Sequence, residues 1–373
     1  MSIAPPMFTR RALASAAILT LTEAGLAQRA IPLPHRPGTI WLNANEFPSG
    51  PPPAAVAAMS KVLNESNRYH YEEFETFFAA LSASMNLRPG NILVGAGSTE
   101  VLHCAVEAFA APDRPFITGW PTFEAGPELA AAKGFPVVKV KLTGSYSSDV
   151  EELAATAKRT GGGLIYVCNP NNPTSSITGK AEMRWLVENL PANTHLLVDE
   201  AYIHFSDSTH LESALGFVRD NANVIVLRTF SKIYGMAGVR VGFAAGRPDS
   251  IRRMTPYRNN VISIMGVRAV LAALELGPKF LDDRRLEIAR TRASFTAWCR
   301  AKQLDYIEPH GNFVMIDTGK DNGGVIAALT ARGVAPGRPF PPYDTKIRIT
   351  VGSDADMEVC KTVLADVLGV PAG

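Results

Sequence analysis

Short apolar segments alternate with helical stretches between about residues 91 and 244, and this alternation limits the possible folds more than any other feature. The candidate strands are Ile92–Val94, Phe116–Thr118, Val137–Lys141, Leu164–Cys168, His195–Asp199, Val224–Leu227 and Val239–Ala244. The candidate helices are Thr99–Ala110, Glu124–Lys133, Val150–Thr160 and Lys180–Asn189. Strands that alternate with helices form a mostly parallel sheet with helices packed against it. The sequence therefore predicts an α/β fold.

The pattern changes from about Pro278, where a long charged helix runs towards Lys302. Strands at Asn312–Ile316 and Lys346–Val351 follow, separated by a helix at Gly324–Arg332. These elements predict a smaller α+β domain, to which we also assign the N-terminal segment around Trp41. The expected division is an N-terminal arm and part of the small domain at 31–60, a large domain at 61–275 and a small C-terminal domain at 276–373.

The first 30 residues have the layout of an export signal. Arg10 and Arg11 precede an apolar run, and the small residues Gly25-Leu26-Ala27 follow it. The run is too short to cross a bilayer. This layout predicts a twin-arginine-like leader at 1–30 and a periplasmic protein. The alternative is an N-terminal extension on a cytoplasmic protein.

Composition excludes several classes of function. The formal net charge is +2 and no dense block of Lys and Arg occurs, so neither a nucleic-acid nor a membrane partner is expected. The four cysteines are far apart and no HExxH motif is present, which predicts neither a disulfide framework nor a metal site.

Four polar motifs follow candidate strands. They are Gly95-Ala96-Gly97-Ser98-Thr99-Glu100, Cys168-Asn169-Pro170-Asn171-Asn172-Pro173-Thr174, Asp199-Glu200-Ala201-Tyr202 and Arg228-Thr229-Phe230-Ser231-Lys232. Ligands of open α/β sheets bind beyond the carboxyl ends of strands, so these motifs are expected on one rim. Backbone N–H groups at Ser98 and Thr99, the hydroxyls near Lys232 and the guanidinium of Arg240 suit a phosphate monoester. Each motif alone is weak, because a single lysine or arginine is usually only a solvated charge.

Taken together and in this order, the motifs resemble the fold type I enzymes that use pyridoxal 5'-phosphate (PLP), and most of all the histidinol-phosphate aminotransferase subfamily. The resemblance extends from about Trp41 to the C-terminus. It includes the segments LNANEFP, NRYHYEEF, NPNNPT, DEAY, TFSK with an arginine eight residues later, and RITVG. It implies that the large domain binds PLP and that the functional unit is a homodimer. It also implies transfer of an amino group from an amino acid or histidinol phosphate to a 2-oxo acid, with 2-oxoglutarate expected.

The resemblance implies cofactor roles for individual residues. Lys232 would hold PLP as a Schiff base and then move the α-proton, and Asp199 would pair with the ring nitrogen. Asn172 and Tyr202 would bond the phenolic oxygen, and Phe123 would stack on the ring. The phosphate would contact Ser98, Thr99, Thr229, Ser231 and Arg240, together with Tyr69 of the neighbouring subunit.

On the substrate side, Arg348 would bind the anionic group and Asn45 would lie near it. Arg338 would supply a second cation, although the stretch from Gly333 to Arg348 looks shorter than in histidinol-phosphate enzymes. Ser175 stands where this family usually has glycine, and His70 where proline is frequent.

Three other functions stay open at this point. The same residues serve decarboxylases, lyases and racemases of this superfamily, because the outcome depends on which bond lies perpendicular to the ring. A PLP-binding protein without turnover is a second alternative. A phosphate-binding α/β protein of unrelated chemistry is the third, although the sequence has no GxxxxGK[ST] motif.

Overall fold

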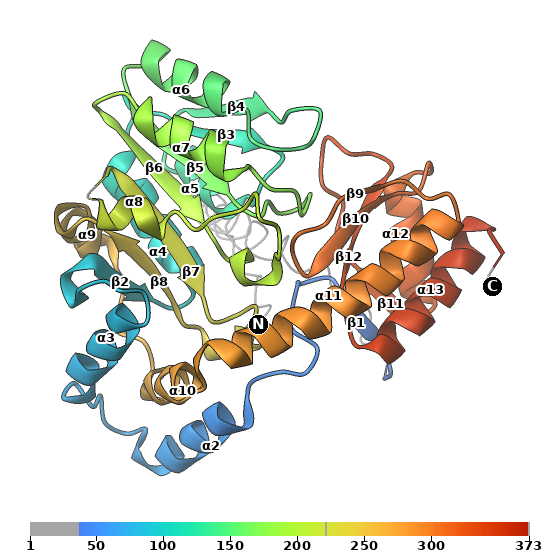
Figure 1. Ribbon diagram of the computed structural model, residues 1–373, viewed down its shortest axis with the longest axis horizontal. Coiled ribbons are helices and arrows are strands. Elements are labelled where there is room, and N and C mark those ends of the chain that lie inside the picture. Colours follow the sequence, from blue (N-terminus) through green and yellow to red (C-terminus); the bar gives the residue numbers. More distant parts are fainter. Residues whose placement is uncertain (1–36, 221, 372–373) are drawn as a thin grey trace, which may run out of the picture.

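The computed structural model describes residues 37–220 and 222–371, so the predicted leader at 1–30 lies outside the described residues. A seven-stranded sheet forms the larger part of this chain (Figure 1). Its strands are β2 (Ile92–Gly95), β3 (Phe116–Trp120), β4 (Val137–Lys141), β5 (Gly163–Cys168), β6 (Thr194–Asp199), β7 (Val224–Thr229) and β8 (Gly242–Gly246). They lie in the order β2-β8-β7-β6-β5-β3-β4, and only β8 runs antiparallel to its neighbours. The predicted α/β class with a mostly parallel sheet is confirmed.

Successive residues of the central strands enter two different cores. On β6, Leu196 and Val198 belong to one buried cluster and Leu197 to the other, as the two-residue period of a strand requires. Helices α4 (Ser98–Phe109), α5 (Ala125–Ala132) and α9 (Pro248–Met254) pack in one cluster, and α6 (Val150–Arg159), α7 (Lys180–Glu188), α8 (Leu215–Arg219) and α10 (Ile264–Leu274) in the other. Both faces of the sheet are therefore covered, which explains why its strands read as continuous apolar runs.

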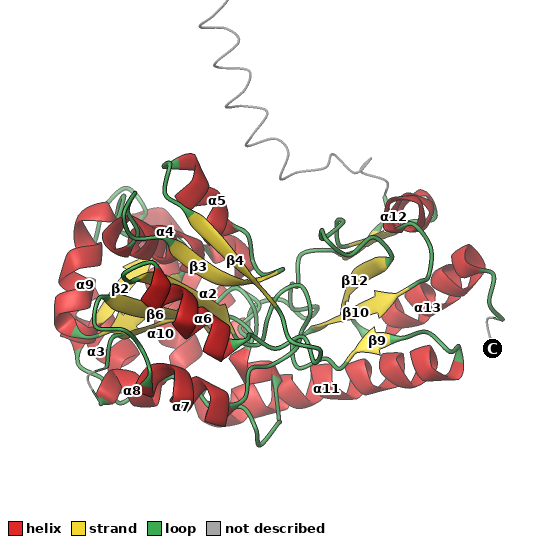
Figure 2. Ribbon diagram, turned by 90° about the horizontal axis from the view of Figure 1, so that it is seen from above, coloured by secondary structure: helices red, strands yellow, loops and turns green. Residues whose placement is uncertain are grey.

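The C-terminal part is built on a smaller antiparallel sheet. Its strands β9 (Tyr306–Ile307), β10 (Phe313–Asp317) and β12 (Lys346–Thr350) lie in the order β12-β10-β9, with α12 (Asn322–Ala331) and α13 (Asp354–Leu368) beside them. The N-terminal strand β1 (Ile40–Leu42) pairs in parallel with β11 (Val334–Pro336). Helix α11 (Gly277–Ala301) extends along both parts (Figure 2). The domain boundaries stay predictions.

Some predicted elements differ from the structure. The strand expected at Val239–Ala244 begins later, at Gly242, because a 3₁₀ turn at Ala237–Val239 and a left-handed Arg240 (φ 60°) precede it. Within residues 37–220 and 222–371, six helices were not predicted: α2 (Pro53–Val62), α3 (Glu73–Ala83), α8, α9, α10 and α13. Helix α10 shows the reason in one case, because it is apolar and buried on most sides and has no clear polar face to reveal its period.

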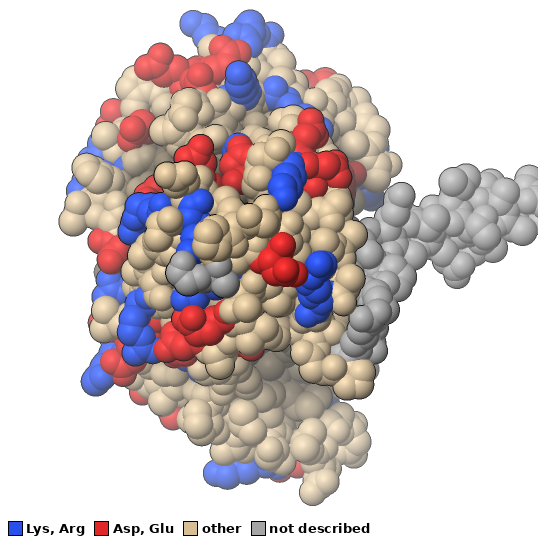
Figure 3. Space-filling model, turned by 90° about the vertical axis from the view of Figure 1, so that its right-hand side faces the viewer, with Lys and Arg blue, Asp and Glu red and all other residues tan. Residues whose placement is uncertain are grey.

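The surface carries charges of both signs. Figure 3 shows acidic and basic side chains interspersed on the face formed by the C-terminal part. Among the described residues, no helix has both the length and the apolar character that crossing a membrane requires.

Candidate functional site

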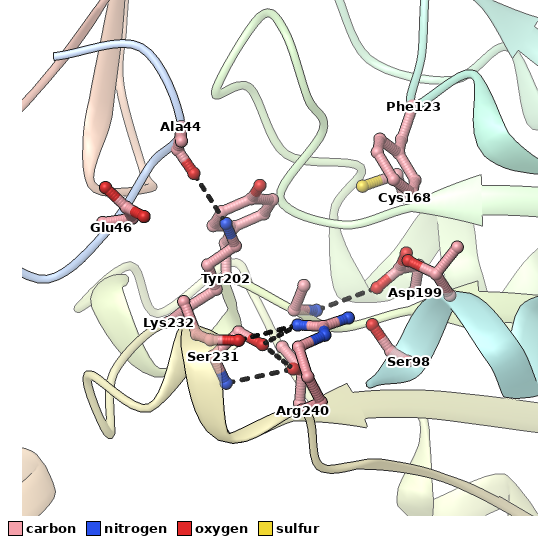
Figure 4. Close-up of a pocket in the computed structure, with 14 residues that line it drawn as sticks. Ala44, Glu46, Ser98, Phe123, Cys168, Asp199, Tyr202, Ser231, Lys232 and Arg240 are labelled. Atoms are coloured by element: carbon pink, nitrogen blue, oxygen red, sulfur yellow. Dashed lines mark hydrogen bonds between the residues drawn. The ribbon is translucent and has the colours of Figure 1, made fainter. Parts of the chain in front are cut away.

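The strand ends bring the four polar motifs to one edge of the seven-stranded sheet. They surround a cavity of about 200 Å³ (Figure 4). Its lining includes the predicted residues Ser98, Thr99, Phe123, Asp199, Tyr202, Thr229, Ser231, Lys232 and Arg240, together with Ala44, Glu46, Cys168, Ala201 and Ala237. We call this space the cofactor cavity. Residues as distant in the chain as Ala44 and Arg240 thus meet here, and the polar motifs lie where parallel strands end, as expected.

Lys232 projects into the cofactor cavity and is held by one backbone contact. Its Nζ donates a hydrogen bond to the carbonyl oxygen of Ala44 at 2.8 Å, and lies 5.7 Å from the ring centroid of Tyr202 (Figure 4). Burial lowers the pKa of Lys232 to about 8, and the nearby charge of Arg348 acts in the same direction. A substantial fraction of this amine is therefore neutral near physiological pH, as attack on an aldehyde requires.

Asp199 is a buried carboxylate, 3% exposed, with two hydrogen-bond donors. The hydroxyl of Tyr166 donates to its Oδ2 at 3.0 Å, and the backbone N–H of Ala201 donates to its Oδ1 at 3.0 Å. Burial raises the pKa of Asp199 to about 6 despite these bonds. A buried carboxylate of this kind is stabilised by a cation, such as a protonated ring nitrogen.

Tyr166 is a site residue that the sequence analysis missed. It lies on β5, where Cys168 pairs with Asp199 of β6, so Tyr166 is the diagonal neighbour of Asp199 on the same face of the sheet. Its pKa is raised well above the usual value, mainly by burial, and its hydroxyl therefore stays protonated as a donor. Finding this contact requires the pairing register of β5 and β6, which a single sequence does not give.

An anion-binding cradle closes the other end of the cofactor cavity. Ser98 and Thr99 begin α4 directly after Gly97 (φ 84°), and Arg240 donates from Nη1 to Ser231 Oγ at 3.4 Å. A Cβ on Gly97 would lie 2.2 Å from Arg240 Nη2, and a Cβ on Gly242 would lie 2.2 Å from the Ser98 nitrogen. Only glycine therefore leaves room for the helix start and the guanidinium to face one anion.

A second cavity of about 480 Å³ adjoins the first, and we call it the substrate cavity. The two share Ala44, Phe123, Tyr202 and Lys232, and the substrate cavity adds Trp41, Asn43, Asn45, Glu124, Asn172, Ile326, Pro336, Arg338, Phe340 and Arg348. Four further predicted residues line the substrate cavity. Three of them were predicted near the substrate, and the fourth was predicted to bind the phenolic oxygen. They are Asn45, Arg338 and Arg348, and Asn172.

Arg348 is a buried cation in the substrate cavity. Its Nη1 donates to Asn172 Oδ1 at 2.6 Å and its Nη2 donates to the carbonyl oxygen of Asn43. Its Nε has no hydrogen-bond partner among the described residues. Burial lowers the pKa of Arg348 to about 10, which still leaves it charged at neutral pH. An anionic substrate group would compensate this charge.

Asn45 links the two cavities through hydrogen bonds. Its Nδ2 donates to the Tyr202 hydroxyl at 3.1 Å, and its Oδ1 accepts from Thr350 Oγ1 at 3.1 Å. Burial raises the pKa of Tyr202, so the phenol is neutral. The wall between the cavities is therefore fixed by a neutral hydrogen-bonded chain.

Two remaining predicted features lie elsewhere. Tyr69 is 68% exposed, stacks on Tyr71 with ring centroids 5.2 Å apart, and lines neither cavity. Ser175 adopts a left-handed conformation (φ 62°), a region of backbone space that favours glycine. Its Oγ accepts a hydrogen bond from the Gly311 backbone at 2.8 Å, a contact that glycine could not make.

The donor set fits PLP. The cofactor cavity combines four features. They are the Lys232 amine, the buried carboxylate of Asp199, the cradle of anion donors and the aromatic side chain of Phe123 on the wall. These four features match an aldehyde, a basic ring nitrogen, a phosphate and a ring face.

Comparisons with known proteins agree with this geometry. The family model "Aminotransferase class I and II" matches residues 37–365. The chain is 31% identical to the histidinol-phosphate aminotransferase of Moorella thermoacetica, over 88% of this chain and 85% of that protein. It is 34% identical to the aromatic amino acid aminotransferase of Mycobacterium bovis, over 85% and 89%. The structure of the histidinol-phosphate aminotransferase of Sinorhizobium meliloti in complex with PLP superimposes with a TM-score of 0.82, at 27% identity, covering 91% of this chain and 98% of that one.

Proposed function

Because the chain belongs to the class I and II aminotransferase family and is a PLP-dependent enzyme of fold type I, we propose specific substrates and residue roles for it. The donor is an amino acid or histidinol phosphate, and the acceptor is a 2-oxo acid, with 2-oxoglutarate expected. The two half-reactions follow each other in a ping-pong sequence. One observation carries this proposal: the Lys232 amine lies on the wall shared by the cofactor and substrate cavities.

PLP, when bound, supplies an electron sink that makes the α-proton of the donor acidic. Lys232 holds the cofactor covalently and then takes and returns the proton at the α-carbon, because its amine faces both cavities. Asp199 stays ionised opposite the ring nitrogen, supported by the donated hydrogen bonds of Tyr166 and Ala201.

The other cofactor contacts divide by chemistry. Asn172 and Tyr202 would hold the phenolic oxygen, and Phe123 would cover one face of the ring. The phosphate contacts belong to a single cluster, formed by Ser98, Thr99, Thr229, Ser231 and Arg240. Together these groups would hold the ring in the cofactor cavity, next to the Lys232 amine.

On the substrate side, Arg348 binds the anionic group of the donor. Its unpartnered Nε and its burial both favour an anion in this position. Asn45 lies next to the same group, and Arg338 approaches from the rim of the substrate cavity.

The functional unit in this proposal is a homodimer in which Tyr69 reaches the phosphate of the neighbouring subunit. Tyr69 is exposed and does not line the cofactor cavity of its own chain, and both observations support this role. Sedimentation of the purified enzyme should give a dimer. A monomer that retains full activity would contradict the assignment of Tyr69.

Export through the leader is part of the proposal. A twin-arginine signal moves folded proteins, so the enzyme would reach the periplasm with its cofactor. N-terminal sequencing of the mature protein tests this. A mature chain that retains Arg10 and Arg11 would contradict export. Because histidine is made in the cytoplasm, export would favour a donor other than histidinol phosphate.

The decisive experiment is a half-reaction with a panel of amino donors that includes histidinol phosphate. The holoenzyme is mixed with each donor without any acceptor, and the visible absorbance of bound PLP is followed. A suitable donor removes this absorbance stoichiometrically, and a 2-oxo acid restores it. If no donor changes the absorbance, the proposed donors are wrong.

A further inference from the structure

An ion pair occupies the rim of the substrate cavity. Arg338, which follows β11, donates from Nη2 to the carboxylate of Glu124, which lies directly before α5. Both residues line the substrate cavity. The side chain of Glu124 is 19% exposed and that of Arg338 is 42% exposed, so the carboxylate is the more buried partner. The second cation predicted for the substrate is therefore already paired with a carboxylate of the same chain.

The ion pair lies close to Arg348, which is expected to bind the anionic group of the substrate. The guanidinium carbons of Arg338 and Arg348 lie 4.3 and 4.7 Å from the centroid of the same ring, that of Phe340. Arg348 is also near enough to both members of the pair that their charges act on its pKa, Arg338 lowering it and Glu124 raising it. A substrate anion bound to Arg348 must therefore interact with Glu124 as well.

The remaining wall of the substrate cavity is mostly uncharged. Trp41, Ile326, Pro336 and Phe340 contribute apolar surface. Among its lining residues, Arg348 is the one arginine that makes no ion pair with a carboxylate in the described structure. The cavity thus offers one cation and an apolar surface, with Lys232 reserved for the chemistry.

We propose that Glu124 determines specificity by neutralising Arg338, so that the preferred substrates carry one negative charge and an apolar or aromatic side chain. This inference rests on the proposed function, narrows its range of donors, and replaces the expected acceptor 2-oxoglutarate, a dianion, with a 2-oxo acid that carries one negative charge. A second negative charge, on a phosphate dianion or a dicarboxylic side chain, would have to displace the Glu124 carboxylate or remain beside it. The Glu124 carboxylate and a second negative charge on the substrate would repel each other, and the partial burial of Glu124 limits screening of this repulsion by salt.

Binding of unreactive acids to the holoenzyme tests the proposal without turnover. Calorimetric titration compares 3-phenylpropanoate, a monoanion, with glutarate, a dianion. We expect the wild type to bind the monoanion more tightly. Glu124→Gln should tighten glutarate binding by about tenfold, because it removes the like charge and releases Arg338. Arg338→Gln should weaken glutarate binding relative to the wild type, because the negative charge of Glu124 is then no longer neutralised.

A matched control is Glu188→Gln, an exposed residue on α7 that lines neither cavity. It should change neither dissociation constant. If Glu124→Gln also leaves the ratio of the two constants unchanged, or if the wild type binds glutarate more tightly, the proposal is wrong.

Turnover gives an independent measurement with the same variants. We expect the ratio of kcat/KM for histidinol phosphate to kcat/KM for phenylalanine to rise about tenfold in Glu124→Gln, mainly through KM. A wild type that prefers histidinol phosphate would overturn the proposal. If no donor reacts in any variant, the proposed function fails, whereas the titrations with unreactive acids still decide the role of Glu124.

Discussion

The cofactor cavity and the substrate cavity share a wall but are built in different ways. The cofactor cavity lies at the ends of neighbouring strands in one sheet, and its polar groups are largely held by backbone or buried side chains. The substrate cavity lies between that edge and segments of the C-terminal part, and its rim carries a partly exposed ion pair. The difference suggests that the chemistry is fixed by the sheet, while the choice of substrate depends on contacts between distant segments.

The largest effect is expected at the shared wall. Lys232→Ala should abolish turnover and the visible absorbance of the covalently held cofactor, because no other amine lines the cofactor cavity among the described residues. Lys141→Ala, an exposed change at the end of β4, serves as the control and should keep both properties. Activity retained in the first variant would contradict the assignment of Lys232.

Arg348→Gln should act mainly on the substrate cavity. Removing the cation that binds the anionic group should lower kcat/KM for every donor by about 100-fold, while the cofactor stays bound. Steady-state kinetics and a spectrum of the same sample check both parts. A loss of cofactor from this variant would show that the two cavities do not function separately.

Asp199→Asn should make the cofactor-free protein more stable at pH 8, by about 3 kcal/mol. The folded pKa of about 6 lies above the ordinary 3.8, so folding favours the protonated carboxyl. This contribution is fully present below pH 3.8 and is lost as the pH rises through about 6. Denaturant unfolding at pH 8 and pH 4 measures it. An advantage of the variant that is equally large at pH 4 would exclude this electrostatic cause.

Tyr166→Phe should have the smallest effect, visible as a shift along the pH axis. The lost hydrogen bond favoured the ionised carboxylate, so the pKa of Asp199 should rise further. As the pH is lowered, the variant should therefore lose its cofactor at a higher pH than the wild type does. The difference in pH should be about one unit or less. Spectra of dialysed samples across pH 4 to 8 would show this shift, and Tyr257→Phe, a change at an exposed tyrosine that lines neither cavity, should not move it.

The cofactor half of the site was predictable because each motif directly follows its strand. Asp199 ends β6 and Lys232 comes three residues after β7 ends at Thr229, so the order of strands was enough to place them on one rim. The contact of Tyr166 with Asp199 was missed because it crosses between strands, and pairing register is not visible in a single sequence.

The residues of the substrate cavity were harder to predict from the sequence, for a physical reason. Glu124 and Arg338 are 214 residues apart, and no local pattern marks either as a member of an ion pair. The pairing of β1 with β11 likewise joins opposite ends of the described chain. Among the helices, strongly amphipathic α6 was predicted, whereas α10, which is apolar on most sides, was not.

The separate linings of the two cavities have a consequence for how such a protein diversifies. Trp41, Ile326, Arg338 and Phe340 line the substrate cavity and take no part in the cofactor cavity. Substitutions at these four positions change the substrate cavity while leaving every residue that lines the cofactor cavity in place. A combinatorial library confined to them would explore new amino donors from a catalytically intact starting point.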